Sequence, residues 1–97
     1  MRQVLDEIVA ERVRQHDKWG EQNWPDGTGS SVYEWLAGGK KRATDKAAKD
    51  GSLTFLHILE EEVYETFAES DKAKLRAELI QVAAVAVAWV EKIDRGY

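Results

Sequence analysis

Apolar residues recur at helical spacing along most of the chain, and no segment alternates apolar and polar residues as a strand does. The first such stretch predicts an amphipathic helix that ends near Lys18. Its repeat comprises Val4, Leu5, Ile8, Val9, Arg12, Val13 and His16. The following residues, 19–29, contain the only proline and three of the seven glycines, so they are predicted to form a loop.

The middle of the chain predicts a helix whose start, interruption and end are each marked by particular residues. Ser31 is followed three residues later by Glu34, a spacing that predicts a capping box at the start of a short helix. Gly38 and Gly39 are expected to interrupt this helix. Helical composition then resumes and stops at Gly51, a suitable C-terminal cap.

The second half of the chain predicts two longer helices. Ser52 is the expected cap of the first, which runs to about Glu69, while Ser70 and Asp71 begin the last, which continues to roughly Arg95. The short connection forces the two helices to run antiparallel. The predicted fold is therefore an all-α small helical bundle with two long antiparallel C-terminal helices, completed by oligomerisation.

Length, charge and composition narrow the class of protein. The 97 residues predict a single domain over 1–97, and a chain this short cannot enclose all its apolar residues without a partner. The net charge of -4 disfavours general nucleic-acid binding, and the absence of cysteine excludes thiolate metal sites. The longest apolar run, Leu79–Val90, is too short for a membrane span, and no secretory signal is recognisable, so we expect a cytoplasmic protein.

The first of the two C-terminal helices is unusually acidic. Between Ser52 and Ser70 there is no lysine or arginine, but five glutamates: Glu60, Glu61, Glu62, Glu65 and Glu69. Each like-charged pair three or four residues apart costs about 0.2–0.5 kcal/mol on an exposed helix. A divalent cation would compensate this repulsion. Alternatively, the glutamates form a solvated face opposite the apolar stripe that includes Leu59 and Val63.

The last helix offers a second polar pair. Its segment Leu79–Val90 is apolar except for Gln81, so we expect surrounding protein to enclose it. Glu78 and Gln81 point the same way and can face Glu62 and Glu65 across the antiparallel pair. Such hard oxygen ligands suit Mg²⁺ or Mn²⁺ and not zinc.

A plainer interpretation of the same helix stays open. Lys74, Glu78, Gln81 and Lys92 can form a narrow solvent-exposed stripe, in which Lys74 and Glu78 make an ordinary surface ion pair. The acidic pattern then has no ligand.

At these residues the chain resembles the MazG-like all-α nucleoside triphosphate pyrophosphohydrolases. The family signature is Glu-Glu-x-x-Glu, a gap, and then Glu-x-x-Asp. Here "EEVYE" provides Glu61, Glu62 and Glu65, and "ELIQ", twelve residues further on, provides Glu78 and Gln81. The resemblance covers the two C-terminal helices well and the first half of the chain loosely.

The resemblance implies Mg²⁺-dependent cleavage of a nucleoside or deoxynucleoside triphosphate to a monophosphate and pyrophosphate, in a homodimer or homotetramer. Glu62, Glu65 and Glu78 would ligate the metal, and Glu61 would orient or deprotonate the attacking water. Gln81 replaces the family aspartate and would be a weak ligand or an outer-sphere residue. The alternative is a noncatalytic nucleotide- or protein-binding helical module that has lost turnover through this replacement; a purely structural bundle is a third interpretation.

The first half of the chain supplies cations and aromatic rings that a nucleotide would need. Candidate substrate-binding residues are Lys18, Trp19, Asn23, Trp24, Lys40, Lys41 and Arg42. The basic residues are equally consistent with a solubilising surface, and the tryptophans with anchors that hold the loop to the core. His16 lies on the apolar side of the first helix and is expected to be an interior residue.

Overall fold

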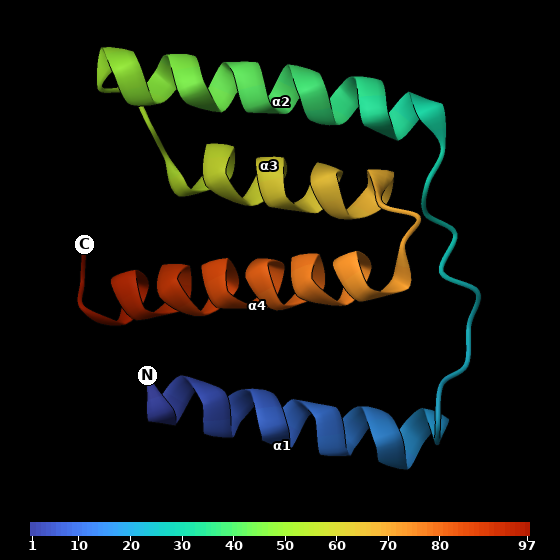
Figure 1. Ribbon diagram of the computed structural model, residues 1–97. Coiled ribbons are helices and arrows are strands. Elements are labelled where there is room, and N and C mark those ends of the chain that lie inside the picture. Colours follow the sequence, from blue (N-terminus) through green and yellow to red (C-terminus); the bar gives the residue numbers. More distant parts are fainter. The chain divides into compact units, whose positions relative to one another are not determined.

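The computed structural model describes all residues, 1–97, as four helices without a strand (Figure 1). The helices are α1 (Arg2–Trp19), α2 (Ser31–Asp50), α3 (Phe55–Ala68) and α4 (Lys72–Asp94). The predicted all-α class is therefore confirmed. The chain forms two compact units, Met1–Asp26 with Val87–Tyr97, and Gly27–Ala86, so that α4 contributes to both.

The first unit contains α1 and the last turns of α4. Val4 and Val87 are its buried apolar side chains. The N-terminal ammonium group lies 2.6 Å from a carboxylate oxygen of Glu91 and so ties the start of α1 to α4. The expectation that His16 is interior is wrong: His16 is exposed, because only Val4, near the other end of α1, is buried on this helix.

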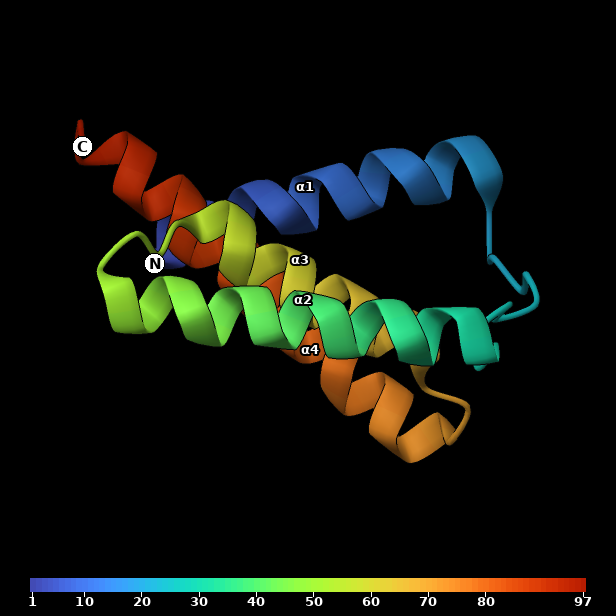
Figure 2. The same ribbon diagram turned by 90° about the horizontal axis from the view of Figure 1, so that it is seen from above.

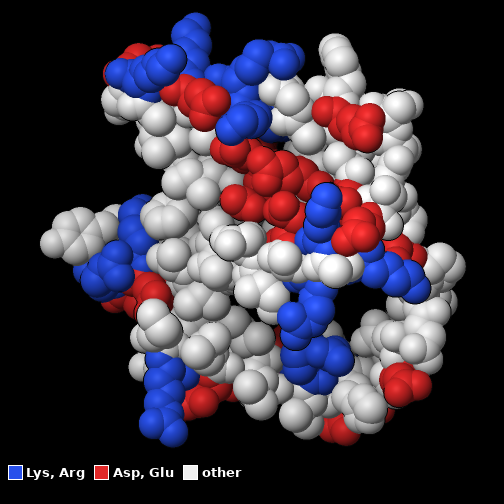
Figure 3. Space-filling view, viewed as in Figure 1, with Lys and Arg blue, Asp and Glu red and all other residues white.

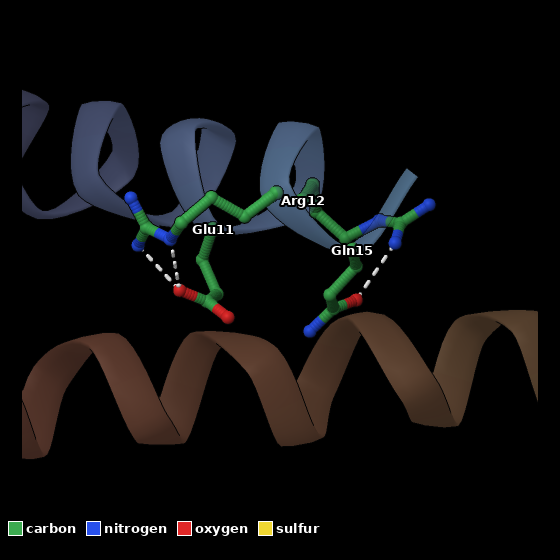
Figure 4. A network of polar contacts seen from close by, with 4 residues as sticks. Glu11, Arg12 and Gln15 are labelled. Carbon is green, nitrogen blue, oxygen red and sulfur yellow. Dashed lines mark hydrogen bonds and ion pairs between the residues drawn. The ribbon is translucent and has the colours of Figure 1, made fainter. Parts of the chain in front are cut away.

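Polar contacts along α1 are local and exposed. Arg14 donates to Glu11 from Nε over 2.8 Å, and Arg12 donates to Gln15 over 2.7 Å (Figure 4). Contacts of this kind between residues three apart stabilise an exposed helix by only a few tenths of a kcal/mol.

In the second unit, α2 packs antiparallel to α3, and the two helices lie side by side in both ribbon views (Figures 1 and 2). Thr44 of α2 is buried and donates a hydrogen bond of 3.1 Å to the carbonyl oxygen of His57. At the other end of the pair, the rings of Tyr33 and Phe67 meet edge to face at 5.2 Å between centroids. This packing fixes the register of α2 against the acidic helix.

The predicted interruption at Gly38 and Gly39 is wrong, because α2 continues through both glycines to Asp50. Each glycine costs about 1 kcal/mol relative to alanine in a helix, and packing of α2 on α3 offsets this cost. The guanidinium group of Arg42 also lies against the two glycines: a Cβ atom added to Gly38 would lie 3.4 Å from Arg42 Nη1. The corresponding distance from a Cβ atom on Gly39 to Arg42 Nη2 is 3.8 Å, so at both positions an added methyl group would only touch the end of that side chain.

Helix caps differ from the predicted ones at two positions. Ser31 is the first residue of α2, and Ser30 before it makes no capping hydrogen bond, so the expected capping box is absent. Ser52 does not cap α3, because it contacts Asp50 instead. The cap of α3 is Thr54, whose hydroxyl accepts from the backbone N–H of His57 while the His57 ring accepts from the backbone N–H of Thr54.

Two other predicted helix boundaries, the end of α2 and the start of α4, are confirmed. Gly51 ends α2 in the left-handed conformation at φ 80°, and the side chain of Asp71 accepts from the backbone N–H of Lys74 over 2.9 Å at the start of α4. The α3–α4 connection is consequently short, and the two helices run in opposite directions (Figure 1).

The apolar middle of α4 is not enclosed within one chain. Leu79 and Ile80 are 50% and 56% exposed, so the single chain does not surround this helix, and enclosure by a second chain stays a prediction. The physical reason is a shortage of neighbours, since α2 and α3 are the only other helices of the second unit. No helix combines the length and the apolar character needed to cross a bilayer.

Candidate metal centre

Three carboxylates from α3 and α4 converge in the second unit. Glu62 and Glu65 lie one turn apart on α3, and the short connection brings Glu78 of α4 opposite them. One carboxylate oxygen from each residue lies within 4.8 Å of the others, and all three side chains are half-buried. Three hard oxygen donors at this separation can hold a divalent cation such as Mg²⁺ or Mn²⁺.

The electrostatics of this cluster disfavour three simultaneous negative charges. Partial burial, followed by the charges of Glu62, Glu78 and Glu61, raises the pKa of Glu65 from about 4.5 to about 7. Partial burial and the charges of Glu78 and Glu61 also raise the pKa of Glu62. Without a cation, the cluster therefore retains a proton near neutral pH that a bound metal ion would displace.

Lysines of α2 neutralise the neighbouring glutamates of α3. Lys40 Nζ lies 3.1 Å from Glu60, and Lys41 Nζ lies 4.0 Å from Glu61 and 3.9 Å from Asp45. In Figure 3, acidic side chains gather over the region of α3, and basic ones border them on the α2 side. Glu62, Glu65 and Glu78, in contrast, make no ion pair with a lysine or arginine.

A cleft of about 360 Å³ adjoins the three carboxylates. Its lining residues are Glu34, Ala37, Glu65, Ala68, Glu69, Ser70 and Glu78. Glu69, one of the five glutamates of the acidic helix, and Glu34 of α2 add two carboxylates to the cleft, and the sequence did not suggest Glu34 as a site residue. Glu34 reaches the cleft because the first turns of α2 pack alongside α3, whereas its spacing from Ser31 had indicated only a capping box.

The candidate ligand Gln81 is exposed. It lies one turn after Glu78 but is not among the residues that line the cleft. A neutral amide there adds no negative charge to the cluster, so the three glutamates supply its charge.

The candidate residues that surround the first loop belong to the first unit. Lys18 Nζ lies 4.9 Å from the centre of the Trp19 ring, and Asn23 donates to Glu21 over 3.1 Å. Trp19 and Trp24 are 60% and 75% exposed, so neither anchors the loop in a core.

Arg42 lies on a different face of α2 from the cleft. At 100° per residue, Trp35 and Gly39 project about 160° and Arg42 about 140° away from Ala37, although Arg42 lies only about 80° from Glu34. Together with Lys40 they line a separate groove of about 230 Å³. Lys40 and Lys41 thus border the acidic helix, whereas Arg42 lies on the outer surface of α2.

Comparison of the chain with protein-family models, with curated proteins and with solved structures finds no match. The fold and the side chains therefore define the class: an all-α protein with a cluster of three glutamates that can hold a metal ion.

Proposed function

We propose that the chain is a Mg²⁺-dependent nucleoside triphosphate pyrophosphohydrolase that releases pyrophosphate and a nucleoside monophosphate. The observation that carries the proposal is the convergence of Glu62, Glu65 and Glu78, whose oxygens lie within 4.8 Å. The spacing of these glutamates is also the one that resembles the MazG-like family. Both the reaction and the identity of the metal are part of the proposal.

In this proposal the three glutamates hold Mg²⁺, which neutralises charge on the triphosphate when bound. Glu61 lies beside them, half-buried and 4.0 Å from Lys41. Its carboxylate would accept a proton from the attacking water. Lys40 and Lys41 lie beside the acidic helix, where they pair with Glu60 and Glu61. When a triphosphate binds, they would leave these carboxylates and bind phosphate oxygens.

The small core supports the proposal that the protein works as a homodimer or homotetramer. Only four apolar side chains are buried, and none of them is a large, fully enclosed residue: Val4, Ala47, Leu75 and Val87. A second chain would cover exposed apolar residues such as Leu79 and Ile80.

The neutral, exposed Gln81 favours one further candidate, a module that binds nucleotides without cleaving them. A cluster with one carboxylate fewer than the family signature would hold the metal less tightly. The two candidates share the binding step and differ in turnover.

Pyrophosphate release separates the candidates. The protein is incubated with Mg²⁺ and a panel of ribo- and deoxyribonucleoside triphosphates, and we expect release that Glu62→Gln reduces at least about 100-fold. Glu7→Gln is the matched control, because Glu7 is exposed on α1 and its substitution changes the net charge by the same amount. Nucleotide binding without release would support the noncatalytic module, and neither binding nor release would support a structural role for the glutamates.

A further inference from the structure

The groove on the outer face of α2 combines an exposed indole with an unpaired guanidinium group. Its lining residues are Trp35, Leu36, Gly39, Lys40, Arg42 and Ala43. Trp35 is 74% exposed, and Arg42 is exposed and makes no ion pair. At 100° per residue, both project about 120–180° away from Thr44 and Ala47, the buried residues of α2. The groove therefore opens on the side of α2 that does not pack against α3.

Gly39 lines this groove, although packing within the chain does not require a glycine there. A glycine in the middle of a helix destabilises that helix relative to alanine. A Cβ atom on Gly39 would meet only Arg42 Nη2, at 3.8 Å. What the missing side chain leaves open is space in the groove, where a ligand can approach the helix backbone closely.

The cations of the groove are placed to bind an anion beside the indole. The guanidinium group of Arg42 lies against Gly38 and Gly39, back along the helix in the direction of Trp35. Lys46 follows Arg42 by about one turn and makes no ion pair either. In Figure 3, basic side chains gather at the outer edge of α2. Two cations without carboxylate partners thus border a single exposed ring.

We propose that this groove binds a small planar aromatic ligand that carries one phosphate group, the chemistry of a nucleoside monophosphate. The ring of the ligand would lie over Gly39 against the indole of Trp35, and Arg42 would bind the phosphate through its paired donors. The volume of about 230 Å³ is below that of pockets for drug-sized ligands and suits one ring with its substituent. The groove shares no lining residue with the acidic cleft, and binding there needs neither a metal ion nor turnover, so the site does not depend on the proposed function.

Composition and charge favour this ligand over a nucleic-acid strand. Proteins bind single strands with successive aromatic rings, whereas Trp35 is the only aromatic residue on the outer face of α2. The net charge of -4 also repels a polyanion at a distance, while Arg42 and Lys46 together match the charge of a single phosphate group.

The first test is calorimetric titration of the protein with adenosine monophosphate in EDTA, which prevents metal-dependent binding in the acidic cleft. We expect one site per chain with a Kd on the order of 100 µM. Adenosine and inorganic phosphate should each bind at least about 10-fold more weakly, because each lacks one half of the ligand. No binding of the nucleotide at millimolar concentration, or equal binding of phosphate alone, overturns the inference.

The second test locates the ligand with two matched pairs of variants. Arg42→Ala should weaken binding at least about 10-fold, and Arg2→Ala, which makes the same change in net charge on the exposed side of α1, should not. Gly39→Ala should also weaken binding at least about 10-fold, although its thermal midpoint should rise, so misfolding cannot explain the loss. Gly38→Ala is its control, because Gly38 does not line the groove. Equal affinities in Gly38→Ala and Gly39→Ala overturn the inference that a ligand lies over Gly39.

The remaining outcomes separate this site from other occupants and from the proposed function. A six-nucleotide single strand that binds at least about 100-fold more tightly than the mononucleotide through Arg42 would make a strand the occupant and overturn the inference. Light scattering that shows a dimer dependent on Arg42 would place a second copy in the groove and also overturn it. Glu62→Gln should lose pyrophosphate release and still bind adenosine monophosphate in EDTA as the wild type does. Loss of that binding in Glu62→Gln would place the ligand in the acidic cleft and refute the separate site.

Discussion

Replacing Glu65 with glutamine should stabilise the metal-free protein above neutral pH. The wild-type carboxylate shares its surroundings with Glu62 and Glu78, and its pKa is raised to about 7. Glutamine has nearly the same shape, carries no charge and resembles the protonated acid. The variant therefore removes repulsion without leaving a cavity.

The spacing of the cluster sets the size of the effect. At 4.8 Å, one like-charged pair costs between about 0.9 kcal/mol in water and about 3.5 kcal/mol at an effective dielectric constant of 20. A pKa raised from 4.5 to about 7 corresponds to roughly 3.4 kcal/mol at full strength. Because the carboxylates are only half-buried and water screens them, we expect about 1–2 kcal/mol.

The sign of the pH dependence follows from which state holds the proton more tightly. The folded protein keeps the Glu65 proton to a higher pH than the unfolded chain does, so this contribution to stability is complete below about pH 4.5. It is lost as the pH rises from there through about 7. Wild type and Glu65→Gln should therefore be equally stable at pH 4.5, and the variant more stable at pH 8.

Thermal unfolding in EDTA measures the difference. At pH 8 the midpoint should rise by about 5–10 °C in Glu65→Gln and stay unchanged in the control Glu7→Gln. Adding Mg²⁺ at pH 8 should stabilise the wild type and not the Glu65 variant. Equal midpoints for wild type and Glu65→Gln at pH 8 would show that the carboxylates do not repel one another, and the electrostatic argument for a cation would fail.

Three further changes test the helices and the ligand set. Thr54→Ala should lower the free energy of unfolding by about 1 kcal/mol through loss of the α3 cap, while Ser52→Ala has little effect, as measured by urea titration; the reverse order would place the cap at Ser52. Gly39→Ala should raise the free energy of unfolding by about 1 kcal/mol, because alanine favours the helix and its Cβ atom would meet only an Arg42 nitrogen at 3.8 Å. A lower free energy of unfolding in this variant would show that the helix has no space for the methyl group. Gln81→Asp should tighten Mg²⁺ binding about tenfold by calorimetry, and an unchanged affinity and turnover would remove residue 81 from the metal site.

The helices were predictable because each carries its own periodic pattern. The end of α1 near Lys18 and the start of α4 after Asp71 agree with the structure, as does the cap at Gly51. The helix break predicted from local propensity at Gly38 and Gly39 is wrong, because packing of α2 on α3 outweighs the cost of two glycines in a helix. The predicted cap of α3, Ser52, is also wrong. The capping box at Thr54 was not recognised because its third helical residue is His57, where glutamate or glutamine is usual.

The candidate site, like the helices, was predictable only where it depends on residues that are close in the sequence. The approach of Glu78 to Glu62 and Glu65 follows from helical spacing and a short connection, both visible in the sequence. The part played by α2 depends on its register against α3, which no sequence pattern specifies. For that reason Glu34 was missed, and the pairing of Lys40 with Glu60 could not be foreseen.

The ion pair between Lys40 and Glu60 supports the proposal that a cation binds the other glutamates. A helix with five glutamates and no internal lysine could in principle be neutralised wholly by a neighbouring helix. Here α2 supplies Lys40 and Lys41 to one side of α3 and no cation to the side that faces Glu78. The most closely spaced carboxylates without a cation are therefore Glu62, Glu65 and Glu78, and the pKa of Glu65 among them is raised to about 7, so a divalent ion gains most by displacing a proton there.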